Sequence, residues 1–172
     1  MKFPNEICEV KIQKICLPIA VLLILSGKIA YAQNIQVLNF EQLEHRFKKN
    51  TDSTYFINFW ATWCLPCVKE LPIIDSIGKK YDNENLKILL VSLDFSDQLE
   101  TRLIPFINKN NITNEVVLLD APNYNSWIDK VSEDWSGGIP ASLIYNNNSR
   151  DFFEKSFDFH ELDSIIKSKL KY

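Results

Sequence analysis

Two cysteines separated by two residues form the most chemically suggestive stretch of the sequence, Trp63-Cys64-Leu65-Pro66-Cys67. Thiols at this spacing can be half of a metal site, a local structural disulfide, or a redox pair that makes and breaks its own disulfide. These three chemistries need different surroundings. The residues on either side of the pair therefore decide between them.

The flanking sequence places the pair where a strand gives way to a helix. The run TYFINFWA is rich in β-branched and aromatic residues and ends just before Cys64. Apolar side chains then recur at helical spacing, at Val68, Leu71, Ile74 and Ile77. A thiolate at a helix start meets unpaired backbone N–H groups and the positive end of the helix dipole. This environment lowers the thiol pKa from about 8.5 into the range of roughly 3.5–7.5.

The two cysteines consequently receive different predicted roles. Cys64, at the helix start, is the predicted nucleophile. Cys67, one turn deeper, is predicted to be more buried and to resolve the mixed disulfide that Cys64 forms with a partner. Pro66 suits the first helical turn, where its missing N–H is not required. Leu65 and Pro66 place no polar side chain between the two sulfurs.

Metal binding and a structural disulfide are the alternatives. Zinc normally needs four ligands, and after residue 32 the chain offers only His45 and His160 besides the two thiols, on separate predicted helices. We therefore predict no zinc site. A structural disulfide would close a loop too short to constrain the unfolded chain much. Copper(I) held between the two thiolates stays open, because soft sulfur ligands suit that ion.

The other periodicities predict an α/β domain. Further strands are expected at QVLNF, LKILLVSLD, EVVLLD, IPASLIYN and DFFEKSF, and further helices after Asn39, from Asp97, near Ser126 and from Asp158. Alternating elements early and a hairpin late, turning at Asn147-Asn148-Ser149, predict a central mixed β-sheet flanked by helices on both faces. A chain of 172 residues suits one such core.

The first 32 residues have the layout of an export signal. Lysines precede a short apolar run, CLPIAVLLILSG, and Ala30-Tyr31-Ala32 supplies small residues at the cleavage positions. About a dozen apolar residues fall short of the roughly 20 that span a bilayer, which favours a cleaved signal over a retained anchor. We predict cleavage near Ala32, a domain at 33–172, and a periplasmic or cell-envelope location, where disulfides persist.

The charge balance argues against one class of partner. The chain has 22 acidic and 19 basic residues, a net charge of −3, and loss of the lysine-rich signal would make the remainder more acidic. Nucleic acid phosphates require a basic face on the protein, so no nucleic acid partner is expected.

Three separated motifs resemble the thioredoxin superfamily, and within it the exported TlpA/ResA-like thiol-disulfide oxidoreductases. They are Phe59-Trp60-Ala61-Thr62-Trp63-Cys64-Leu65-Pro66-Cys67, Glu70-Leu71-Pro72 and Gly138-Ile139-Pro140-Ala141. The resemblance implies a thioredoxin-like fold over the mature chain, with Pro140 in a cis peptide bond that faces the cysteines. It also implies an extended substrate lying against Trp63, Leu65, Pro66, Ile139 and Pro140.

The resemblance adds Glu70 and Pro140 to Cys64 and Cys67 as candidate catalytic residues. Glu70 matches an acidic position that the TlpA/ResA-like group places near its active site, where it could relay protons or raise the cysteine pKa. The alternative is a solvated helix glutamate. Asn58 stands where many thioredoxins carry a buried acid, so that proton acceptor is expected to be missing.

Three tryptophans have predicted positions in the core or near the site. Trp60 is expected in the core. Trp127 and Trp135 precede the expected cis-proline loop and either form a lid or wall for the substrate or pack an inserted helix.

These observations predict dithiol-disulfide exchange on exported proteins, as a reductase without a dissociable cofactor. The resemblance suggests thiols of apocytochrome c or of other envelope proteins as substrates, and a membrane thiol reductase as the electron donor. A disulfide-donating oxidase would use the same site at a higher potential. A non-enzymatic copper(I) metallochaperone would use the same two thiolates. No separate cysteine suggests a peroxidase.

Overall fold

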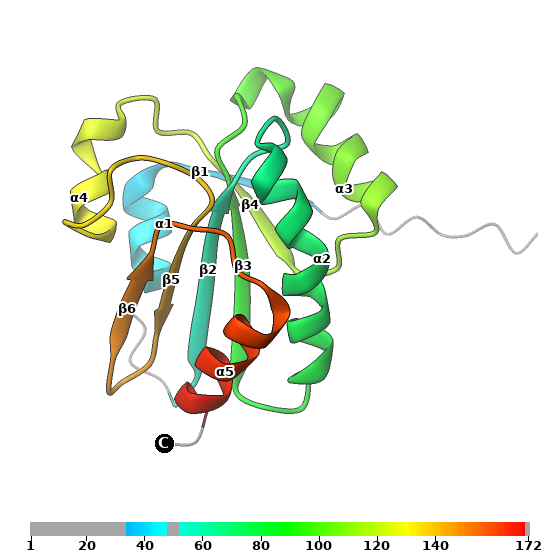
Figure 1. Ribbon diagram of the computed structural model, residues 1–172. Helices are drawn as coiled ribbons and strands as arrows, with labels where there is room; N and C mark the ends of the chain where they lie inside the picture. Colours follow the sequence, from blue (N-terminus) through cyan, green and yellow to red (C-terminus); the bar gives the residue numbers. More distant parts are fainter. Residues whose placement is uncertain (1–33, 48–51, 171–172) are drawn as a thin grey trace, which may run out of the picture. The chain divides into compact units, whose positions relative to one another are not determined.

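The core of the fold is a six-stranded sheet, seen in the computed structural model, which describes residues 34–47 and 52–170 (Figure 1). Its strands are β1 (Gln36–Leu38), β2 (Thr54–Trp60), β3 (Leu86–Ser92), β4 (Glu115–Leu119), β5 (Ala141–Tyr145) and β6 (Arg150–Phe153). They lie in the order β1-β4-β3-β2-β5-β6. The first four in that order pair in parallel, whereas β5 is antiparallel to both of its neighbours. The predicted mixed sheet and late hairpin are therefore confirmed.

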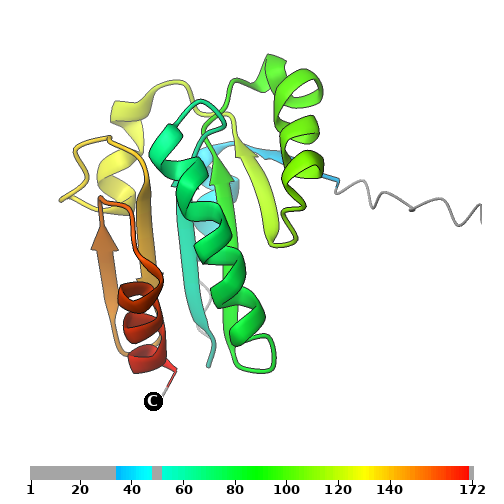
Figure 2. The same cartoon turned by 45° about the vertical axis from the view of Figure 1, so that its right-hand side comes forward.

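Helices cover both faces of this sheet, as the sequence predicted (Figures 1 and 2). The α-helices are α1 (Phe40–Phe47), α2 (Leu65–Lys80), α3 (Ile104–Asn110), α4 (Ile128–Val131) and α5 (Phe159–Lys169). Buried side chains of α2, α3 and α5 join one hydrophobic cluster with Phe56 and Trp60 of β2. Buried side chains of α1 and α4 join a second cluster with Ile57 and Phe59 of the same strand. Strand β2 is thus buried on both faces, which explains its nearly continuous apolar sequence.

Two predicted helices differ from expectation in form. The segment expected from Asp97 begins as a 3₁₀ turn, η1 (Ser96–Gln98), continues as a π-helical turn, η2 (Leu99–Leu103), and only then becomes α3. Pro105 lies in the first turn of α3, and its missing N–H interrupts the regular ladder of helical hydrogen bonds at that point. The helix expected near Ser126 is a 3₁₀ turn, η3 (Tyr124–Ser126), followed by the four residues of α4.

Capping residues fix where three helices begin. Asn39 and Gln42 exchange hydrogen bonds between side chain and backbone at the start of α1, each at 2.9 Å. The Asp158 carboxylate accepts the N–H of Glu161 at 2.9 Å and caps α5. Cys64 caps α2 with its sulfur. Helix α2 therefore begins directly after the first cysteine, as the strand-to-helix pattern predicted.

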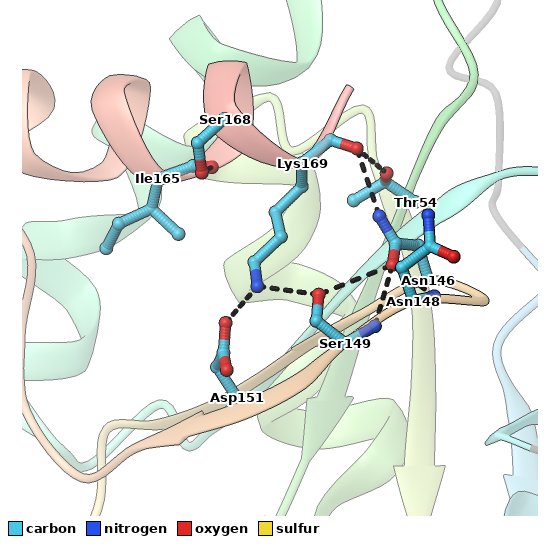
Figure 3. Close-up of polar contacts among 8 residues, drawn as sticks. All are labelled: Thr54, Asn146, Asn148, Ser149, Asp151, Ile165, Ser168 and Lys169. Carbon is cyan, nitrogen blue, oxygen red and sulfur yellow. Dashed lines mark hydrogen bonds and ion pairs between the residues drawn. The ribbon is translucent and has the colours of Figure 1, made fainter. Parts of the chain in front are cut away.

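The C-terminal helix is fixed to the sheet at the end where β2 begins (Figure 3). The Lys169 ammonium pairs with Asp151 of β6 and donates to the Ser149 hydroxyl at 2.7 Å. The Lys169 carbonyl accepts from the Asn146 amide at 3.0 Å and from the Thr54 hydroxyl at 3.3 Å. These contacts tie α5 to the start of β2 and to the β5–β6 hairpin, whose predicted turn is present.

The expected signal segment and its cleavage site lie outside the described residues. Within residues 34–47 and 52–170, no helix is long and apolar enough to cross a membrane.

Candidate active site

Cys64 and Cys67 form a disulfide at the start of α2, with their Cα atoms 5.3 Å apart. The N–H of Cys67 donates to the Cys64 sulfur at 3.3 Å, and the N–H of Cys64 donates to the Ala61 carbonyl at 3.1 Å. Cys67 is 1% exposed and Cys64 is 6% exposed. The deeper position of Cys67 is confirmed. In the disulfide form Cys64 is itself buried, and the Ile139 carbonyl lies 3.7 Å from its sulfur.

The residues beside Cys64 form an apolar surface around it. Trp63, Leu65 and Pro66 are exposed, and Trp63 and Leu65 are among the few large apolar side chains that face solvent. Phe95, on the loop after β3, is another. A partner that approaches Cys64 therefore meets the bulky apolar side chains of Trp63 and Leu65.

The loop before β5 brings a backbone carbonyl to the cysteine pair. The Ile139–Pro140 peptide bond is cis, as the resemblance implied. The carbonyl oxygen of Ile139 lies 3.7 Å from the Cys64 sulfur. Cys64 follows the end of β2, and Pro140 immediately precedes the start of β5. Because β5 pairs antiparallel with β2, both residues lie at the same end of two adjacent strands.

A buried acid that sequence reasoning missed holds the loop before Cys64. Asp94 accepts from the Thr62 N–H at 3.0 Å, from the Thr62 hydroxyl at 2.5 Å and from the Ser92 hydroxyl at 2.8 Å. Thr62 is two residues before Cys64, so Asp94 ties the cysteine loop to the end of β3. A single acid closing the apolar run LKILLVSLD was the signal that could have found it.

The two tryptophans before the cis-proline loop are packing residues. Trp127 and Trp135 are both buried and contact each other and Phe59. The indole N–H of Trp127 donates to the Ala121 carbonyl at 3.0 Å, and that of Trp135 donates to the Gly138 carbonyl at 2.8 Å. The packing interpretation is confirmed, and the lid interpretation is wrong because neither side chain is free to close over a substrate.

Glu70 is a buried acid on the inner side of α2. It is 1% exposed, and its carboxylate accepts the Phe157 N–H at 2.7 Å and the Asn58 amide at 3.3 Å. Burial raises its pKa to about 7, although both hydrogen bonds oppose this shift. The interpretation as a solvated helix glutamate is therefore wrong. Because Glu70 is three residues after Cys67, both side chains lie on the same face of the helix.

Asn58 occupies the interior beside Glu70. It is buried in β2, and its amide nitrogen also donates to the Ser142 hydroxyl at 3.0 Å. Its amide oxygen has no hydrogen-bond partner among the described residues. Glu70 of α2 thus places a buried acid beside Asn58 of β2. Sequence reasoning noted both residues but did not bring them together.

No metal-binding cluster is visible in the part of the chain that the structure describes. No three His, Cys, Asp or Glu side chains gather there in a group that could hold an ion.

The region around this site is similar to one protein family and to several known proteins. The model of the AhpC/TSA family matches residues 30–149. Thiol-disulfide oxidoreductase ResA of Bacillus anthracis is 29% identical over 97 residues, which cover 46% of this chain and 56% of the relative. Sporulation thiol-disulfide oxidoreductase A of Bacillus subtilis is 33% identical over 69 residues, 40% of this chain and 42% of the relative. The chain thus spans about half the length of the curated relatives it matches.

Solved structures share the fold at lower identity. StoA from Bacillus subtilis superposes with a TM-score of 0.54 at 24% identity, covering 67% of this chain and 83% of that one. A thioredoxin-related protein from Neisseria meningitidis serogroup B gives a TM-score of 0.58 at 19% identity, covering 69% and 86%. With the family model matching most of its length, the chain belongs to the AhpC/TSA family, and its described part is a thioredoxin-superfamily domain with a Cys64–Cys67 disulfide at the start of α2.

Proposed function

We propose that this protein is a thiol-disulfide oxidoreductase of the ResA/StoA type, with Cys64 as nucleophile and Cys67 as resolving cysteine. The observation that carries the proposal is the position of Cys64 as the cap of α2, where the Cys67 N–H points at its sulfur. In the reduced protein the same N–H and the helix dipole favour the Cys64 thiolate over the thiol. Relatives that match this region are named for the same activity.

The exchange transfers two electrons and two protons. The Cys64 thiolate attacks one sulfur of a client disulfide, which breaks that bond, forms a mixed disulfide and releases the first client thiolate. Cys67 then loses its proton and attacks the Cys64 sulfur, releasing the second client thiolate and forming the Cys64–Cys67 disulfide. Both client thiolates end as thiols. Glu70, with a pKa of about 7 and one turn from Cys67, is suited to accept the Cys67 proton near neutral pH.

We propose further that the protein acts as a reductase on exported proteins in the periplasm or cell envelope. The N-terminal sequence supports export, and the resemblance to the TlpA/ResA-like group supports clients such as apocytochrome c and a membrane thiol reductase as electron donor. Direction depends on the reduction potential. Equilibration with glutathione should give a value closer to about −270 mV than to the about −120 mV of a strong oxidant. A value above about −180 mV would instead favour a disulfide-donating oxidase.

A turnover assay tests the activity itself. The reduced protein should reduce a synthetic peptide disulfide with dithiothreitol as electron source, and Cys64→Ser should abolish the reaction. The copper(I) metallochaperone hypothesis predicts the reverse pattern, in which purified protein carries about one copper per chain and gives no turnover. That second pattern would refute the oxidoreductase proposal.

A further inference from the structure

Glu154 lies just beyond β6 and holds the loop that precedes the cis proline. Its carboxylate accepts three hydrogen bonds from that loop, all of ordinary or short length. The donors are the Ser136 N–H at 2.8 Å, the Ser136 hydroxyl at 2.5 Å and the Gly138 N–H at 2.7 Å. Both carboxylate oxygens are used. A single carboxylate, that of Glu154, therefore binds three polar groups of the neighbouring loop.

The loop sequence is built to let this carboxylate approach the backbone. A Cβ atom on Gly138 would lie only 2.4 Å from the Glu154 Oε1 oxygen, so any other residue there would push the carboxylate away. Gly137 has a φ of +98°, a conformation that side chains disfavour. Partial burial raises the pKa of Glu154, but the hydrogen bonds from Ser136 and Gly138 outweigh it, and the pKa lies below its usual value. Glu154 is thus ionised at neutral pH.

Gly138 is held from its other side as well. Its carbonyl accepts the indole N–H of Trp135, which packs on Phe59 of β2 with ring centroids 4.7 Å apart. Both backbone groups of Gly138 are therefore fixed by side chains. The next residue, Ile139, is the one whose carbonyl lies 3.7 Å from the Cys64 sulfur. The position of that carbonyl depends on the anchoring of Gly138.

We infer that Glu154 is a positioning residue that orients the Ile139–Pro140 backbone to receive an extended polypeptide next to Cys64. The inference rests on the proposed function and adds to it a residue outside the cysteine pair that positions the substrate. A polypeptide bound beside Cys64 must match the backbone groups of this loop, because main-chain hydrogen bonds form only at a narrow range of positions. A small disulfide needs only the Cys64 sulfur. Loss of Glu154 should therefore impair peptide substrates selectively.

The test compares two disulfides with the full-length protein, which dithiothreitol returns to the dithiol form after each turnover, and the uncatalysed rate with dithiothreitol alone is subtracted. One is a synthetic peptide closed by a single disulfide, and the other is bis(2-hydroxyethyl) disulfide, which has no peptide groups. Glu154→Ala should raise KM for the peptide about tenfold, equivalent to about 1.4 kcal/mol, with kcat nearly unchanged. The rate with the small disulfide should stay within about twofold of wild type. Glu154→Gln keeps an acceptor oxygen and should recover part of the peptide KM.

A matched control separates loop positioning from loss of surface charge. Glu161 is half-buried and pairs with Lys155, the neighbour of Glu154, and no hydrogen bond joins its carboxylate to the loop among the described residues. Glu161→Ala should leave both substrates at wild-type values. If Glu154→Ala does not fold, Ser136→Ala removes a single donor and should raise the peptide KM about threefold.

The outcomes distinguish this inference from the function on which it rests. An unchanged peptide KM in Glu154→Ala, or an equal loss with both disulfides, would overturn the positioning role while leaving the oxidoreductase proposal intact. A wild-type protein that reduces neither disulfide would overturn the proposed function, and the positioning role with it.

Discussion

Glu70 is a carboxylic acid enclosed by protein, and its titration links the site to the stability of the fold. Burial is the larger influence and raises its pKa from 4.5 to about 7, while the hydrogen bonds from Phe157 and Asn58 lower it. The folded protein therefore binds this proton more tightly than the unfolded chain does. The contribution of protonated Glu70 to the free energy of unfolding is fully present below pH 4.5 and is lost as the pH rises through about 7.

Replacing Glu70 with Gln should remove this pH dependence. The shift corresponds to about 3 kcal/mol, so the wild type should lose roughly that much free energy of unfolding relative to Glu70→Gln between about pH 4.5 and pH 8. The glutamine is accommodated because its oxygen can accept the Phe157 N–H, while its amide can face the Asn58 oxygen, which has no hydrogen-bond partner among the described residues. Urea unfolding of both oxidised proteins across this range measures the difference. Parallel stability curves would show that Glu70 does not titrate near neutrality.

At the scale of elements, the two ends of the sheet serve different purposes. The carboxyl ends of β2 and β3 lead to the Cys64 and Asp94 loops, which form the site. The opposite end is closed by Lys169 of α5, whose side chain is largely buried between Asp151 and Ser149 (Figure 3). Changes at Lys169 should therefore affect stability without affecting exchange chemistry.

Lys169→Met tests this separation. It removes an ion pair and a hydrogen bond from a largely buried ammonium, and we expect a loss of about 1–2 kcal/mol in the free energy of unfolding. Lys167→Met, on the exposed side of the same helix, should change it by less than about 0.5 kcal/mol. Urea denaturation measures both variants, and the rate of peptide disulfide reduction should match wild type for each. A loss of turnover in a folded Lys169→Met protein would contradict the separation of the two ends.

The sequence was informative where a single pattern determined a single element. The β-rich run before Cys64 and the helical spacing after it located the redox pair correctly, and the helices expected after Asn39 and from Asp158 are present. Contacts between distant segments were not predictable in the same way. The approach of Glu70 to Asn58 depends on the register of α2 against β2, and the approach of Glu154 to Gly138 depends on the path of the chain after β6.

In the molecule as a whole, the two cysteines occupy unequal positions. Cys64 caps α2 and lies beside the Ile139 carbonyl, while Cys67 is one turn deeper and almost without exposure. Attack should therefore belong to the first sulfur and release of the client to the second. Metal binding, by contrast, would use both sulfurs alike.

Trapping mixed disulfides in cells measures that asymmetry most directly. Cys67→Ser should attack clients but fail to release them, so covalent adducts accumulate. Non-reducing gels resolve these adducts, and reduction then frees the client for identification by mass spectrometry. Cys64→Ser should trap little, because its remaining thiol is buried and lacks the stabilisation of the helix start. Adducts with Cys67→Ser alone are the predicted result. Absence of adducts from both variants, together with tight copper binding by the wild type, would contradict an oxidoreductase function and favour copper(I) transfer.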